Sequence, residues 1–186
     1  MRYRGYRGQR DQQLHQFLYF HARLAIGIGM MTIVGQCVGA KDLGGARRYT
    51  MRLMRSAHCM ALALSAAVAL LMNLFLNMFG LSAEAKKIAK ALLWTSYIMS
   101  PVEWPLSFTL LNALRAAGDA RFVMIIAVIS MWAVRVSAAY LLAYHLGMGP
   151  SGVWIAMTAD WCVRGAFYAW RWRHGRWQNK NALIEG

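Results

Sequence analysis

Acidic residues are scarce in this 186-residue chain, which contains seven Asp and Glu residues against 21 Lys and Arg residues. The sequence shows no paired catalytic carboxylates, no Ser/His/Asp arrangement and no glycine-rich phosphate loop. We therefore predict that the chain is not an enzyme. Charged residues of both signs make up only 15% of the chain, whereas soluble domains contain about 25%. This shortage argues against an ordinary soluble domain.

Cysteine is also rare. The three cysteines, Cys37, Cys59 and Cys162, fall within apolar stretches and lack the spacing of metal ligands. The isolated His21 and His58 have no metal-binding partner three or four residues away. We predict free thiols, no metal site and no bound cofactor.

Long apolar stretches fill most of the chain. Hydrophobic residues make up 59% of it, and the mean hydropathy is +0.34. A bilayer core of about 30 Å requires about 20 helical residues, and backbone polar groups in lipid must be hydrogen-bonded within a helix. We predict an all-α integral membrane protein with a basic segment at 1–15, a five-helix membrane domain at 16–171 and a basic tail at 172–186. The five spans are expected at about 16–40, 54–80, 91–114, 122–146 and 151–171.

The net charge of +14 and the isoelectric point near 10.5 are also typical of nucleic-acid-binding proteins. Here, however, the basic residues lie mainly at the ends of the apolar stretches, as charges beside a membrane do. We therefore expect a lipid bilayer, and no nucleic acid, as the partner.

The basic residues also predict an orientation. Two predicted spans separate the loop at 41–55 from the turn at 115–121, and two more separate that turn from the tail. All three regions therefore lie on the same side of the membrane. Together these regions carry eleven basic residues: Lys41, Arg47, Arg48, Arg52, Arg55, Arg115, Arg121, Arg171, Arg173, Arg176 and Lys180. The positive-inside rule places them in the cytoplasm. This predicts a multi-pass protein of the cell (inner or plasma) membrane with a cytoplasmic C-terminus.

The segment at 1–15 opposes this rule. Five spans with a cytoplasmic C-terminus place it outside, although it contains Arg2, Arg4, Arg7 and Arg10. Either this segment is not a natural translocated terminus, or a preceding helix is missing.

The first span combines small residues with one polar side chain. Gly35 and Gly39 are four residues apart and share a helix face, and small residues let neighbouring helices approach closely in lipid. The side chain of Gln36 either forms an interhelical hydrogen bond or lines a substrate cavity.

The third span carries Glu103 between Pro101 and Pro105. Proline removes a backbone donor and obstructs the carbonyl four residues earlier, so the helix should kink or loosen here. A carboxylate beside freed carbonyls can bind a cation or a proton. Glu103 also lies about 18 Å from Arg115 at the cytoplasmic end, so a partly hydrated carboxylate near the membrane surface is the alternative.

The last two spans share intramembrane charges. Arg135 lies about 20 Å from the inner face and Asp160 about 14 Å from the outer one, so in a core of about 30 Å their depths nearly match. We predict an Arg135–Asp160 pair beside Trp161. Arg164, one turn after Asp160, is expected to extend toward the inner face. A structural pair that fixes helix register is favoured over a role in transport.

Three segments resemble the multidrug and toxic compound extrusion (MATE) transporters. They are GQCVGAKDLGGARR from Gly35 to Arg48, LRAAGDAR from Leu114 to Arg121, and GVWIAMTADWCVR from Gly152 to Arg164, followed by a tail ending in GRW at Trp177. The resemblance covers about residues 13–178. The motif residues are Gly35, Gln36, Gly39, Ala40, Arg115, Gly118, Asp119, Asp160, Trp161 and Arg164.

The resemblance implies a twelve-helix antiporter of two six-helix lobes, in which the present spans would be helices 8–12 of the C-terminal lobe. Such transporters exchange Na⁺ or H⁺ for amphipathic, often cationic drugs. Two departures stand out. The N-terminal lobe and the seventh helix are absent, and the acid that many members carry eleven positions before Arg115 would fall on Trp104, with Glu103 one residue beyond.

The leading hypothesis is therefore part of a drug and cation antiporter that needs a complementary N-lobe or another copy of itself. Its substrates would be small amphipathic or cationic molecules, and Na⁺ or H⁺ would be the coupling ion. Glu103 and Gln36 are the candidate ion or substrate residues. The alternative is a non-transporting membrane remnant or an accessory subunit that packs against other helices.

Overall fold

The computed structural model describes residues 24–78 and 83–178, and within these ranges the chain is helical apart from short turns. The basic segment at 1–15, with its four arginines, and the beginning of the first predicted span lie outside the described residues. The same holds for residues 179–186, which include Lys180.

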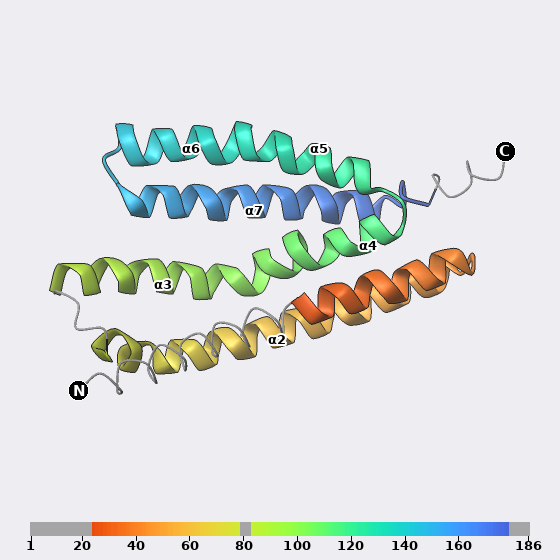
Figure 1. Cartoon of the computed structure of the whole chain (residues 1–186), viewed down its shortest axis with the longest axis horizontal. Helices are drawn as coiled ribbons and strands as arrows, with labels where there is room; N and C mark the ends of the chain where they lie inside the picture. Colours follow the sequence, from red (N-terminus) through yellow and green to blue (C-terminus); the bar gives the residue numbers. More distant parts are fainter. Residues whose placement is uncertain (1–23, 79–82, 179–186) are drawn as a thin grey trace, which may run out of the picture.

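The described residues form five helical rods that run in roughly the same direction (Figure 1). The first is the helix Leu24–Gly39 and the second is α2, Leu43–Met78. The third joins α3 (Ala83–Trp104), the π-helical turn η1 (Pro105–Thr109) and α4 (Leu110–Ala116). The fourth joins α5 (Ala120–Ser130), η2 (Met131–Val136), α6 (Ser137–Ala139) and η3 (Tyr140–His145), and the fifth is α7, Pro150–Arg173.

Two of the described helical segments are long and apolar enough to cross a membrane, Leu43–Leu70 and Ala120–His145, and Leu24–Gly39 is a shorter apolar helix. The α7 helix has 24 residues, or about 36 Å at 1.5 Å per residue. It is long enough to span a bilayer, but its charged residues reduce its hydropathy. These are Asp160, Arg164, Arg171 and Arg173.

Two tight turns connect neighbouring rods in the same way. Lys41 N–H donates to Val38 and Asp42 N–H to Cys37, with Lys41 in the left-handed conformation (φ 59°). Gly118 (φ 81°) occupies the equivalent position in the second turn, where Asp119 N–H donates to Leu114. This pattern is the Schellman helix end, in which one left-handed residue satisfies the last carbonyls.

The predicted loop at 41–55 is wrong for most of its length, because α2 begins at Leu43. The Oδ1 atom of Asp42 accepts a 2.7 Å hydrogen bond from Gly45 N–H and caps the helix. No proline follows, and the arginines of this segment favour helix. The basic residues of this segment lie on the first turns of a helix and not in a loop.

The three basic regions share one end of the molecule. The turn before α2, the turn between α4 and α5, and the end of α7 all lie on the right of Figure 1. The η3–α7 connection lies at the opposite end. This is the alternation that the charge pattern requires.

The third rod changes direction between α3 and α4, where η1 begins at Pro105 (Figure 1). Within η1, Leu110 N–H donates to the Pro105 carbonyl five residues earlier, which is the wider hydrogen-bond spacing of a π turn. Pro105 has no N–H to donate to the carbonyl of Pro101, so the regular α-helical pattern cannot continue through it. The predicted loosening of this helix is therefore found.

The buried core lies at the end of the molecule that carries the basic regions, where all five rods contribute. Small or flexible side chains dominate it, and aromatic residues of α7 close it. Its members are Met30, Val34, Ala46, Met54, Leu110, Ala113, Leu114, Ala117, Val123, Tyr168, Trp172 and Trp177. Trp177 folds back so that its ring stacks on Trp172 with centroids 4.3 Å apart.

Glycines permit the closest approaches between rods. A Cβ atom at Gly35 would lie 4.0 Å from the Cβ of Ala116, but one at Gly39 would meet no atom of residues 24–78 and 83–178 within 4 Å. Close helix packing is thus seen at Gly35, and at Gly39 it stays a prediction. A Cβ at Gly152 would lie 2.8 Å from the backbone nitrogen of Ala143, so the η3–α7 hairpin requires glycine there.

Gly152→Ala is expected to destabilise the protein by about 1–3 kcal/mol, because backbone atoms of the facing helix would have to move. The thermal unfolding temperature in detergent measures the effect. Gly29→Ala is the matched control, since a Cβ there meets nothing within 4 Å and alanine favours helix. Equal melting temperatures for the two variants would contradict the close approach at Gly152.

Candidate functional site: a charge cluster between two helices

A carboxylate on α7 lies at the centre of a polar cluster. Asp160 is fully buried, and its Oδ2 atom is 2.8 Å from Nη2 of Arg135 on η2. The structure thus brings together the two residues that depth matching selected from the sequence. Their ion pair joins α7 to the neighbouring rod.

Arg164 belongs to the same cluster and does not extend toward the inner face. Its Nη2 atom is 2.5 Å from Asp160 Oδ2, and its Nε atom is 3.0 Å from Asp160 Oδ1. The Nε atom also donates to Ser130 Oγ at 2.9 Å. The expected inward extension of Arg164 is therefore wrong, because a carboxylate one helical turn away offers two charge-assisted hydrogen bonds.

The cluster contains two guanidinium groups and one carboxylate, so it carries a net positive charge. The Arg135 guanidinium also lies over the Trp161 ring, 5.7 Å from its centroid. The negative ring face attracts a cation where water is scarce. Ion pairing and a cation–π contact both lower the free-energy cost of placing arginine charges inside a membrane.

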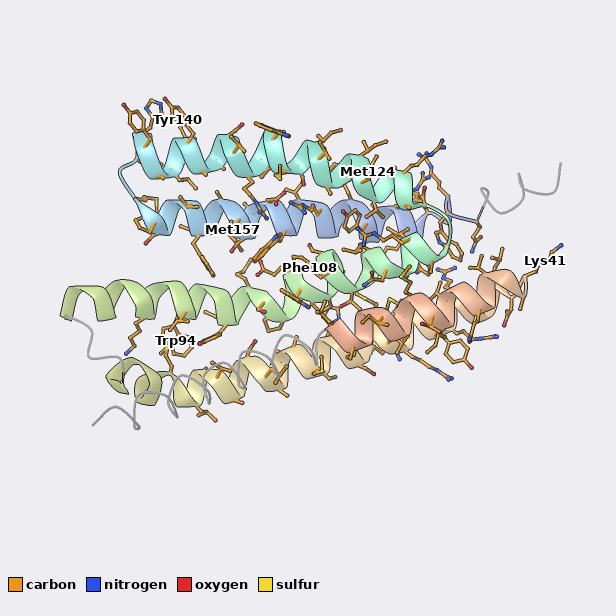
Figure 2. All side chains as sticks on the ribbon, in the orientation of Figure 1. Lys41, Trp94, Phe108, Met124, Tyr140 and Met157 are labelled. Atoms are coloured by element: carbon orange, nitrogen blue, oxygen red, sulfur yellow. The ribbon has the colours of Figure 1, made fainter. Side chains whose placement is uncertain are left out.

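Aromatic stacking connects the cluster to the third rod. Trp161 meets Phe108 edge to face with ring centroids 5.5 Å apart, and Phe108 stacks on Trp104 at 4.3 Å. The hydroxyl of Ser107 donates to the Trp161 carbonyl. Figure 2 places Phe108 at the bend between α3 and α4, on the side that faces α7. The π turn and the charge cluster therefore share one contact surface.

Glu103 lies at the end of α3, immediately before this bend, and only 3% of its surface is exposed. Glu103 is thus shielded by neighbouring side chains of the chain itself. Gln36 lies on a different rod and is exposed. Within the described ranges its side chain forms no hydrogen bond, so the structure does not bring Gln36 and Glu103 together as one site.

The second motif supplies an ion pair that sequence reasoning missed. Asp119 is fully buried, and its Oδ2 atom accepts a 2.6 Å hydrogen bond from Nε of Arg171. The Arg171 guanidinium also lies 4.8 Å from the centroid of the Phe122 ring. The sequence pattern marks Arg171 only as a basic residue near the C-terminal tail, although it lies in the last turn of α7. Asp119 and Arg171 join the turn after α4 to the end of α7.

Other motif residues have structural positions. Gly35 faces α4, Gly118 supplies the left-handed turn residue, and Arg115 and Gly39 are exposed. Ser130 and Ser107 were not selected from the sequence. Ser130 lies five residues before Arg135, and a π turn has this spacing. No obvious sequence signal marks that turn, so the sequence does not group Ser130 with Arg135.

No group of three His, Cys, Asp or Glu side chains that could hold a metal ion occurs among residues 24–78 and 83–178. The polar groups that these ranges do bring together are guanidinium, carboxylate and hydroxyl. Their arrangement can neutralise charge and fix the relative positions of helices.

Arg135→Ala and Asp160→Ala should each destabilise the protein, and Asp160→Ala more strongly, because it leaves two arginines without their counter-ion. Breaking a buried pair costs about 3–5 kcal/mol. The double variant should lose less stability than the sum of the single losses, as measured by unfolding in detergent. Strict additivity would show that the two residues do not interact energetically. Arg48→Ala with Asp42→Ala is the control cycle, since that pair is exposed and 3.9 Å apart.

Comparison with known proteins gives the family. The MatE family model matches residues 12–141. An uncharacterized transporter, YisQ of Bacillus subtilis, is 36% identical over 160 residues, which cover 84% of this chain and 34% of YisQ. No solved structure matches the chain.

Two relatives bear the name "probable multidrug resistance protein NorM". The one from Rhodopseudomonas palustris is 27% identical over 83% of this chain and 33% of its own length. The one from Thermotoga maritima is 24% identical over 96% of this chain and 38% of its own length. The chain thus spans about a third of the length of these relatives. With most of the chain matched by the family model, this protein belongs to the MatE family of membrane transporters.

Proposed function

We propose that the chain is the C-terminal-lobe part of an antiporter that exports drugs and organic cations in exchange for Na⁺ or H⁺. The names of the NorM relatives support the substrate class. The observation that carries the proposal is Glu103, a buried carboxylate beside a proline-induced π turn. A carboxylate in an apolar interior is costly and serves ion or proton binding in many transporters.

The bend gives Glu103 suitable surroundings for a coupling ion. Pro105 cannot donate to the carbonyl of Pro101, which leaves an oxygen near the carboxylate without its helical partner. Carboxylate and carbonyl oxygens together suit Na⁺, and a carboxylate alone suits H⁺. Glu103 is thus the candidate coupling residue, whereas Arg135, Asp160 and Arg164 hold α7 against its neighbour.

Transport by this protein requires a complementary lobe or another copy of the chain. Alternating access moves two helical bundles around a shared site near the membrane midplane, and the chain matches only about a third of its relatives. The proposed location is the cell membrane, with several spans. The basic end of the molecule, including the C-terminus, would face the cytoplasm.

Glu103→Gln should reduce ion-driven efflux of a fluorescent organic cation by about tenfold or more, which corresponds to about 1.4 kcal/mol. The measurement uses proteoliposomes that contain the full reading frame carrying the chain, with an imposed Na⁺ or pH gradient. Glu103→Asp keeps the carboxylate and should retain part of the activity. Expression and unfolding temperature are measured for both variants.

Unchanged efflux and unchanged ion dependence in Glu103→Gln would exclude Glu103 as the coupling residue. A reading frame that begins at Met1, together with no efflux under either gradient, would favour the second candidate function. In that case the chain is a non-transporting membrane remnant or accessory subunit.

A further inference from the structure

The first turns of α2 carry four arginines on the side that faces away from the rest of the molecule. Arg47, Arg48, Arg52 and Arg55 are all exposed. Residues on the opposite side of the same turns are buried, among them Ala46, Thr50 and Met54. Figure 2 shows nitrogen-tipped side chains pointing outward from this end of α2, near the labelled Lys41.

These arginines have little compensating charge. Among the described residues their only acidic neighbour is Asp42, 3.9 Å from Arg48 in a loose, exposed pair. Arg52 lies over the ring of Tyr49 at 5.9 Å. Within residues 24–78 and 83–178, Arg47 and Arg55 form neither an ion pair nor a hydrogen bond, so their guanidinium donors are available to a ligand.

The arginines surround a shallow hollow of about 340 Å³, which is lined by Gly44, Arg47, Arg48, Met51, Arg52 and Arg55. Gly44 has no side chain, which leaves the start of the hollow open. One carboxylate and four guanidinium groups give this region a net charge of about +3. An anion is the complementary ligand.

An apolar surface continues from the hollow along the same helix. Met51 and Leu62 are exposed and lie eleven residues apart, which places them on the same side about three turns from one another. Leu70 is exposed farther along. A ligand that fits this whole surface has an anionic head and an apolar tail.

We propose that the arginine hollow at the start of α2 binds the phosphate of an anionic phospholipid, whose acyl chains lie along Met51 and Leu62. Arginine suits this role because its planar guanidinium can form two parallel hydrogen bonds to phosphate oxygens. Cytoplasmic leaflets are rich in anionic lipids, which basic side chains at the membrane surface attract. The site is independent of transport and of Glu103.

Binding of phosphatidylglycerol and phosphatidylcholine to the purified full-length protein tests the proposal. Native mass spectrometry in detergent, with each lipid titrated, reports the dissociation constant and the number of lipids bound. Arg48→Gln/Arg52→Gln/Arg55→Gln should weaken phosphatidylglycerol binding by about tenfold or more and leave phosphatidylcholine binding unchanged. Circular dichroism and gel filtration check that the variant is folded.

The matched control removes the same charge elsewhere at the same end, in Arg121→Gln/Arg173→Gln/Arg176→Gln. It should change phosphatidylglycerol binding by less than about threefold. Equal weakening in both triple variants would overturn the proposal in favour of a diffuse attraction. Arg48→Lys/Arg52→Lys/Arg55→Lys keeps the charge but loses the paired hydrogen bonds, so its affinity should fall between the wild type and the glutamine variant.

A soluble anion is the remaining competitor for the hollow. Inorganic phosphate is titrated against bound phosphatidylglycerol, and Leu62→Asn removes part of the apolar surface. The lipid proposal expects displacement only at millimolar phosphate or above, and weaker lipid binding by Leu62→Asn. Displacement at the same concentration as lipid itself, with no effect of Leu62→Asn, would identify a soluble-phosphate site and overturn the lipid assignment.

Discussion

A charged group in a membrane-spanning helix must find its counter-charge inside the protein, and Asp160 meets this requirement for two arginines at once. Its carboxylate binds Arg164 on its own helix and Arg135 on the neighbouring rod, at 2.5 and 2.8 Å. This contact fixes the position of α7 against η2. Trp161 and Phe108 then connect α7 to the bend in the third rod. One buried ion cluster therefore joins α7 to the fourth rod and, through Trp161, to the bend that Pro105 produces.

Much of this arrangement follows from the sequence because it depends on local chemistry or on depth. The all-helical architecture, the loosened helix at Pro105 and the Arg135–Asp160 contact come from residue spacing, proline chemistry and the rise of a helix. The beginning of α2 could not be found in this way. Arginine is compatible with both a cytoplasmic loop and a helix, and only the cap from Asp42 to Gly45 decides between them.

Contacts between distant rods were the least predictable. The pairing of Asp119 with Arg171 joins the turn after α4 to the end of α7, two points that are 52 residues apart in the sequence. The π turns η2 and η3 change the rise and rotation of the fourth rod without a proline to mark them. For the same reason Ser130 could not be matched with Arg164 beforehand. Exposure of Gln36 likewise depends on which helices cover it, and its sequence position does not reveal this.

The tight turn between the first two rods has a mechanical consequence. The chain reverses over Ala40, Lys41 and Asp42, and the Asp42 carboxylate is bonded to the start of α2. A Cβ atom at Gly45 would collide with that carboxylate, so glycine is needed at this position for the cap to form. Sliding the helix Leu24–Gly39 along α2 would break the cap. The turn and the cap therefore couple the end of the helix Leu24–Gly39 directly to the start of α2.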